Sequence, residues 1–156
     1  MNAEKAQFLQ NRFVPLLQEI PTETPPAWGK MTLQQMIEHL ADYTRIASGK
    51  VVHTEILTPP EQLDKARAFL ESEKPFRENT PNPLMPETPA PVRNPSKDQA
   101  VKELKKEIDD FFAAFQKNKL QTTRNPFFGE LNFEQNVQLL HKHALHHLRQ
   151  FGVTVT

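Results

Sequence analysis

Two histidines one helical turn apart are the residues whose type and spacing most clearly indicate chemistry in this sequence. Residues 132–152 hold four of the six histidines of the chain and have the pattern of a helix. An α-helix turns by about 100° per residue, so His143 and His147 would point within about 40° of each other. Two imidazoles at this spacing can bind one metal ion. They form half of a site, and the other half must come from another part of the chain.

The two other histidines of this helix are placed less favourably. His141 would face the opposite side. His146 lies about 60° from His143 and about 100° from His147, which makes it a poor third ligand from the same helix. It is better placed to orient a ligand or to face a substrate, where it would act as a catalytic proton shuttle.

A third ligand is expected from an earlier helix. Residues 32–49 have the capping box and the terminal glycine of a helix, and His39 would lie at the border of its apolar face. A helix packed by that face would hold this imidazole in the interior or at a cleft. The sequence therefore predicts that His39, His143 and His147 meet from two helices.

The ligand chemistry is restricted because the chain contains no cysteine. Disulfides, thiolate nucleophiles and iron–sulfur clusters are excluded, so only nitrogen and oxygen can bind a metal. Burying imidazoles side by side is unfavourable unless each is satisfied, and one divalent ion would satisfy them together. Three histidines with open coordination positions suit Zn²⁺, Ni²⁺ or Fe²⁺. The ordinary alternative is a set of hydrogen-bonded core histidines.

Two other metal motifs do not fit. The segment HALHH lacks the glutamate that follows the first histidine in the zinc protease motif H-E-x-x-H. A di-iron carboxylate bundle needs Glu-x-x-His pairs on two helices, whereas Glu38 stands directly before His39.

The remaining elements indicate an all-α fold in a single domain over residues 1–156. Apolar periodicity predicts further helices over residues 3–19, with a break near Pro15, over residues 60–73, and from Ser96 to about Asn118. Residues 119–131 are expected to form a loop with turns. Residues 74–96 hold seven prolines and are expected to form either a surface connector or a lid over a site.

Composition narrows the partners. The formal net charge is zero, so no overall field would attract nucleic acid or an anionic membrane. No stretch reaches the roughly 20 apolar residues of a membrane span, and the first residues do not resemble a signal peptide. The expected location is the cytoplasm, with no nucleic acid and no membrane as partner.

Two segments resemble a known family. Residues 28–40, WGKMTLQQMIEHL, and residues 125–152, NPFFGELNFEQNVQLLHKHALHHLRQFG, are similar to the two signature segments of the DinB-like superfamily and, within it, of the DUF1569 group. One departure is visible, because Asn125 stands where similar sequences often have histidine.

The resemblance implies an up-down-down-up four-helix bundle with a long proline-rich crossover. It also implies a metal, commonly Ni²⁺ or Zn²⁺, bound by His39, His143 and His147, the same three residues that the helical spacing indicates. Some members of the superfamily are thiol-S-transferases or thiol-dependent isomerases that use low-molecular-weight thiols, and others are hydrolases.

Three functions follow from these patterns. The first is a metal-dependent enzyme that acts on a small molecule, as a thiol-S-transferase or a hydrolase. In such a site the metal would lower the pKa of a bound thiol or water. His146 could shuttle a proton, and the carboxylates Glu38, Asp42 and Glu130 are candidates for a base. The second is a metal-containing bundle that binds a ligand or stress signal without turnover. The third is a structural bundle whose histidines lie in the core or at a homodimer contact.

Overall fold

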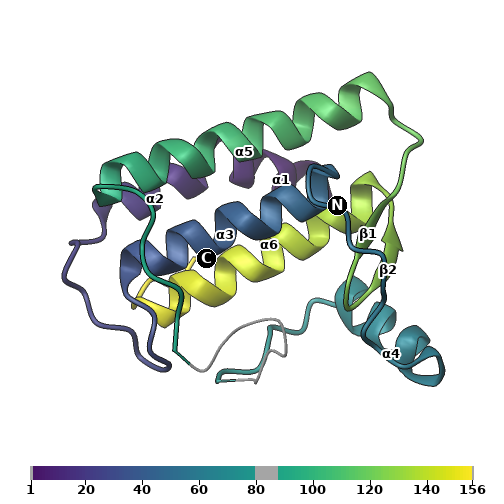
Figure 1. Ribbon diagram of the computed structural model, residues 1–156, viewed down its shortest axis with the longest axis horizontal. Coiled ribbons are helices and arrows are strands. Elements are labelled where there is room, and N and C mark those ends of the chain that lie inside the picture. The colour runs from purple at the N-terminus through teal and green to yellow at the C-terminus, as the bar shows by residue number, and fades with distance from the viewer. Residues whose placement is uncertain (1, 80–87, 156) are drawn as a thin grey trace.

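The computed structural model describes residues 2–79 and 88–155, which form a mostly helical fold with one short hairpin (Figure 1). In chain order the elements are α1 (Asn2–Gln7), the π-helical turn η1 (Phe8–Arg12), α2 (Phe13–Glu19), α3 (Leu33–Ser48), α4 (Pro60–Glu71), α5 (Lys97–Lys117), β1 (Thr123–Asn125), β2 (Gly129–Leu131) and α6 (Phe133–Gln150).

The first helical segment is interrupted where proline requires it. Pro15 has no N–H, and its ring crowds the carbonyl four residues earlier. The wider turn η1 lies directly before α2, and the Phe13 N–H bonds the carbonyl of Phe8, five residues back. The interruption predicted near Pro15 takes the form of this π-helical turn, and the segment stays helical throughout.

The long helices begin and end at the residues that the sequence indicated. Thr32 and Gln35 form a complete capping box before α3, and Gly49 ends that helix with a φ of 86°. The Ser96 side chain accepts a hydrogen bond from the Gln99 N–H and caps α5. Asn132 caps α6 in the same way as Thr32 caps α3, with a second capping box.

The expectation of a plain loop over residues 119–131 was wrong. β1 and β2 pair antiparallel, with Thr123 opposite Leu131 and Asn125 opposite Gly129. Asn125 Oδ1 accepts hydrogen bonds from the backbone N–H groups of Phe127 (2.8 Å) and Phe128 (3.1 Å), and Gly129 has a φ of 81°. These contacts close the turn and bring the flanking residues into register. The side chain of Asn125 therefore stabilises a turn.

The long helices pack side by side along the long axis of the molecule (Figure 1). α3 packs against α5 and α6, α2 packs against α5, and α1 packs against α6. Their shared core is rich in aromatic rings, with Phe111 lying 5.2 Å from Phe115 and 5.9 Å from Phe133 between ring centroids. Burying each such ring contributes about 1.5–3 kcal/mol, so these contacts hold α5 against the start of α6.

A smaller apolar cluster attaches α4 to one end of α6. Leu70 of α4, Leu131 of β2 and Leu139 of α6 are all buried there, and Phe76 and Phe128 pack against them. Figure 1 shows α4 and the hairpin together at this end of the molecule. None of the helices in residues 2–79 and 88–155 is long and apolar enough to cross a membrane.

The proline-rich crossover is attached to the helices at both of its described ends. Lys142 of α6 donates hydrogen bonds to the carbonyl oxygens of Ser72 (2.8 Å) and Lys74. At the far end, Gln35 donates to the Ala90 carbonyl at 3.0 Å. Residues 80–87 lie outside the described residues, so the choice between lid and connector stays a prediction for that part.

Candidate metal centre

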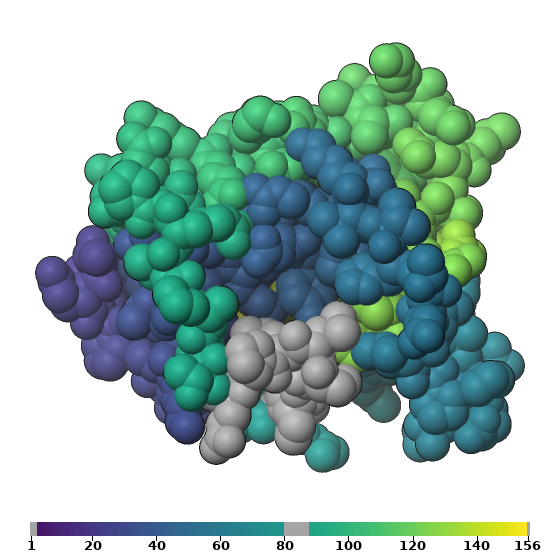
Figure 2. All heavy atoms as spheres, in the orientation of Figure 1, coloured from purple at the N-terminus to yellow at the C-terminus, as the bar shows by residue number. Residues whose placement is uncertain are grey.

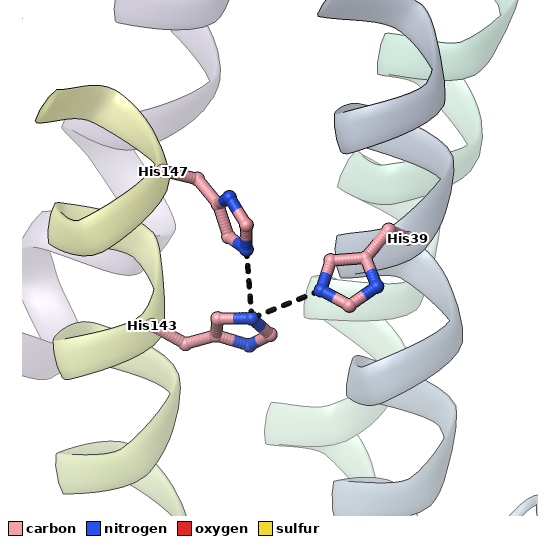
Figure 3. Close-up of side chains that lie close together, drawn as sticks. All are labelled: His39, His143 and His147. Carbon is pink, nitrogen blue, oxygen red and sulfur yellow. Dashed lines mark hydrogen bonds between the residues drawn. The ribbon is translucent and has the colours of Figure 1, made fainter. Parts of the chain in front are cut away.

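Three histidines from two helices meet between α3 and α6. His39 comes from α3, and His143 and His147 come from successive turns of α6 (Figure 3). The Nε2 atom of His143 lies 3.1 Å from His39 Nε2 and 2.9 Å from His147 Nε2. One ring nitrogen from each of the three lies within 4.8 Å of the others. The structure thus brings together the three side chains that the helical spacing selected.

The protons on these rings cannot satisfy every nitrogen. His143 Nε2 contacts two other Nε2 atoms, and a neutral imidazole nitrogen either carries one hydrogen or presents one lone pair. Whichever nitrogen holds the proton, at least one Nε2 of the three is left without a proper partner. A divalent cation would accept a lone pair from all three, and tetrahedral ligands about 2.0–2.1 Å from zinc lie about 3.3 Å apart. The donor set therefore fits a metal ion.

Gln150 fixes the ring of His147 in the form that a metal requires. Gln150 Oε1 lies 2.7 Å from His147 Nδ1, and Gln150 Nε2 donates to the Trp28 carbonyl at 2.9 Å. Since the amide nitrogen is engaged by Trp28, the amide oxygen must face the imidazole, which then carries its hydrogen on Nδ1. The lone pair of His147 is consequently on Nε2, toward the other two histidines.

A glycine lets the loop before α3 approach this amide. A Cβ atom added at Gly29 would lie 3.3 Å from Gln150 Nε2, and Gly29 has a φ of 77°. The Ala27 N–H also donates to the Gln150 carbonyl at 2.7 Å. These contacts join the loop before α3 to the end of α6.

The three imidazoles are neutral at pH 7. Burial lowers the pKa of His39 to about 4, with a contribution from the charge of His146. Burial also holds the pKa of His143 and of His147 well below its usual range, and mutual repulsion among the histidines lowers both further. Neutral imidazole is the form that binds a metal.

Aromatic rings enclose the histidine cluster. Tyr43 lies 4.8 Å from His39 and 5.2 Å from His143 between ring centroids. Phe76, at the start of the crossover, lies 6.0 Å from His143. These rings exclude water from part of the site, which strengthens electrostatic interactions inside it.

His146 lies beside the cluster but outside it. Its ring is 5.0 Å from His147 and 5.3 Å from Trp28, and it forms a hydrogen bond with the Phe76 backbone. Its Nδ1 atom is buried without a hydrogen-bond partner among the described residues. A catalytic role for His146 stays a prediction. His141 faces away, as expected, and packs edge-on against Phe8 at 5.3 Å.

A cavity of about 410 Å³ opens beside His39. Its walls come from α3, from the loop after α3 and from residues 89–93, and Figure 2 shows α3 between these two segments on this face. His53, which has no sequence pattern to single it out, lines this cavity together with Tyr43. The volume is within the range of roughly 300–1,000 Å³ that is typical of small-molecule sites.

The carboxylates considered as bases already have partners. Glu38 accepts hydrogen bonds from the backbone N–H groups of Arg93 (2.9 Å) and Asn94 (3.1 Å). Burial alone would raise the pKa of Glu38, but these bonds, with those from the Gln34 and Asn94 side chains, lower it. Asp42 pairs with Arg93 at 3.0 Å, and Glu130 pairs with Arg124 at 2.6 Å. Asp42 and Glu38 line the cavity, whereas Glu130 does not.

Sequence reasoning missed two parts of this site. Gln150 was not distinguished from other polar residues of α6, although its spacing of three from His147 could have indicated a ring partner. The cavity depends on loop residues such as His53 and Pro89, and no local pattern predicts how separate loops meet.

The fold is mostly helical and brings three histidines together from two helices. The chain is therefore a helical protein with a candidate metal centre. The family model of the DinB superfamily matches residues 6–151, and the chain belongs to this superfamily. No curated protein and no solved structure matches the chain significantly.

Proposed function

We propose that this chain is a metal-dependent enzyme that acts on a small molecule, as a thiol-S-transferase or a hydrolase. The observation that carries the proposal is the convergence of His39, His143 and His147, whose ring nitrogens lie within 4.8 Å of one another beside a cavity. In this proposal the three histidines bind Ni²⁺ or Zn²⁺, with Fe²⁺ as a further candidate. The helices would form the up-down-down-up four-helix bundle of the superfamily, in its DUF1569 group.

The protein residues have separate tasks in this proposal. A divalent ion bound by the three histidines would lower the pKa of a thiol or water ligand and so supply a nucleophile near neutral pH. Gln150 orients His147 and fixes its tautomer. Tyr43 and Phe76 shield the imidazoles from bulk water. His146, which lies beside the histidine cluster, is the candidate for moving a proton to or from the site.

Metal analysis and an activity screen test the proposal together. Untagged protein should contain metal close to a 1:1 ratio, and His39→Ala should lose it. The metal-loaded protein is then screened with an electrophile plus glutathione, bacillithiol or mycothiol, and separately with esters. Turnover that is lost in His39→Ala would support an enzyme. Metal without turnover in any assay would instead favour a metal-containing protein that binds a ligand or stress signal.

Several finer expectations stay predictions. They are a single domain over residues 1–156, a cytoplasmic location, a homodimer contact, and a low-molecular-weight thiol as partner.

A further inference from the structure

Most of the surface of the cavity beside His39 is apolar. α3, the segment before it and the loop after it contribute some of the apolar side chains, and residues 89–91 contribute the rest. The apolar lining residues are Met31, Ile46, Val51, Pro89, Ala90 and Pro91. A ligand that leaves water for this space gains mostly by burying apolar surface.

Arg93 is the one lysine or arginine among the described residues that line the cavity, and it is already paired. Its Nη2 atom lies 3.0 Å from Asp42 Oδ1 and 3.1 Å from Glu103 Oε1. Its Nε atom donates to Glu103 at 3.2 Å, and Nη2 also donates to the Glu38 carbonyl at 3.2 Å. The guanidinium therefore already pairs with two carboxylates and is not available to pair with an anionic ligand. Residues 80–87 contain no lysine or arginine.

Two polar residues of the lining are occupied in holding the cavity wall. Glu38 is only 4% exposed, and its carboxylate accepts the N–H groups of Arg93 and Asn94. Gln35 accepts the Thr32 N–H at 2.8 Å and donates to the Ala90 carbonyl at 3.0 Å. These bonds attach residues 90–94 to α3. The wall is thus fixed before any ligand enters. The polar groups that Glu38 and Gln35 present to a ligand already have hydrogen-bond partners within the protein.

The formal charges of the lining leave an anion unfavoured away from the histidines. Glu38 and Asp42 carry two negative charges and Arg93 carries one positive charge, with histidine counted as neutral. A negative group in this part of the cavity would lose hydration without gaining a free cationic partner. We infer that the cavity takes a small molecule with a metal-binding head group at the histidines and a mainly apolar body that carries no negative charge. Of the three thiols in the activity screen, the carboxylate-bearing glutathione and bacillithiol should therefore be poor partners. This inference rests on the proposed metal-dependent function.

Two matched probes test the body while keeping the head group constant. Benzohydroxamate and 4-sulfobenzohydroxamate share a metal-chelating head, and only the second carries a negative charge on its ring. Each is titrated by calorimetry into the untagged full-length chain loaded with Zn²⁺, and the metal content of the same sample is measured. We expect the sulfonated probe to bind about tenfold more weakly, which corresponds to about 1.4 kcal/mol.

Two variants with the same formal charge change locate the effect. Asp42→Asn frees one side of Arg93 and removes a negative charge from the lining, so the difference between the probes should fall to about threefold. Asp109→Asn removes a charge from an exposed pair with Lys105 on α5, outside the cavity lining, and should leave the tenfold difference unchanged.

The outcomes separate this inference from the proposed function. Equal binding of both probes to the zinc-loaded chain would overturn the apolar, uncharged body while leaving the metal centre in place. An equal change in Asp42→Asn and Asp109→Asn would overturn the assignment of the selectivity to this cavity. If the chain retains no zinc after loading and binds neither probe, the proposed function is overturned, and this inference with it.

Discussion

Two polar clusters lie along α3, one toward α5 and one toward α6. The charge cluster consists of Arg45, Lys50, Glu103, Glu107 and Asp110. In it, Arg45 pairs with Glu103 and with Glu107 (3.1 Å), while Lys50 pairs with Glu107 (2.8 Å) and with Asp110 (2.6 Å). Every one of these groups meets an opposite charge, so the cluster is complete within the protein.

The histidine cluster, made of His39, His143 and His147, lacks this complementarity. Its members are alike, all three are neutral at pH 7, and their Nε2 atoms face one another at 2.9 and 3.1 Å. Such a group gains little from its own contacts and much from an added cation. The charge cluster is therefore satisfied by the protein alone, whereas the histidine cluster has ring nitrogens that an added cation would satisfy.

The largest expected effect is the loss of the stabilisation that zinc supplies, and it should follow from removing one histidine of the cluster. With zinc at about 1,000 times its Kd, the wild-type chain should gain about 4 kcal/mol of unfolding free energy, and His143→Ala should gain almost none. Thermal unfolding with and without zinc measures this. His141→Ala is the matched control, because it removes an imidazole of the same helix that packs on Phe8 instead. A zinc-induced gain of equal size in both variants would show that His143 does not bind the zinc.

Removing a carboxylate from the charge cluster should reduce stability whether or not metal is present. Glu107 is 5% exposed and bridges Arg45 and Lys50. Glu107→Gln should lower the free energy of unfolding by about 1.5–3 kcal/mol, because charged hydrogen bonds to a buried carboxylate are lost. Urea unfolding measures this change.

The control for Glu107 is a pair of the same chemistry at the surface. Arg124 and Glu130 lie 2.6 Å apart, with side chains 40% and 46% exposed. Glu130→Gln should cost at most about 1 kcal/mol, because solvent screens such a pair. A loss in Glu130→Gln as large as in Glu107→Gln would show that burial of the charge cluster does not matter.

The two clusters also differ in how well the sequence predicts them. The histidine cluster follows from helical geometry, because His143 and His147 are one turn apart and His39 borders an apolar face. The helix bounds were equally predictable, since Thr32, Ser96 and Asn132 are strong capping residues.

The charge cluster was not predictable, because the acidic and basic residues of α5 alternate as they would on an ordinary solvated face. Which of them meet Arg45 depends on how α5 lies along α3, and that is decided by the packing of the core. The pairing of β1 with β2 was missed for a similar reason. Three-residue strands carry almost no periodicity, and here the side chain of Asn125 sets their register.

Gln150 should matter to the histidine cluster more than to the fold. Gln150→Leu removes the acceptor for His147 Nδ1, so zinc affinity should fall by about 10–100-fold, as for other residues that orient a ligand. Competition with a zinc chelator measures the Kd. The control is Gln138→Leu, which makes the same change at a buried glutamine of α6 whose amide bonds the Ser72 carbonyl at 2.9 Å. An equal loss of affinity in both would mean that general damage to α6 is responsible.

The smallest expected effect is a pH dependence that belongs to the charge cluster. Burial alone would raise the pKa of Glu103, but hydrogen bonds from Arg45, Arg93 and Asn94 lower it below the ordinary value. A carboxyl with a lowered folded-state pKa stabilises the fold above its unfolded pKa, and this stability is lost as the pH falls through the folded value. The difference in unfolding free energy between the wild-type chain and Glu103→Gln should therefore be full at pH 7 and shrink below about pH 4.5.

Urea unfolding from pH 7 to pH 3 checks this, and a difference that stays constant over the whole range would contradict it. A chelator provides the complementary condition, because it removes the metal-linked stability and should leave the Glu103→Gln difference at pH 7 unchanged. Since the chelator acts only on the metal, a loss of the Glu103→Gln difference on chelation would show that the two clusters are coupled through α3.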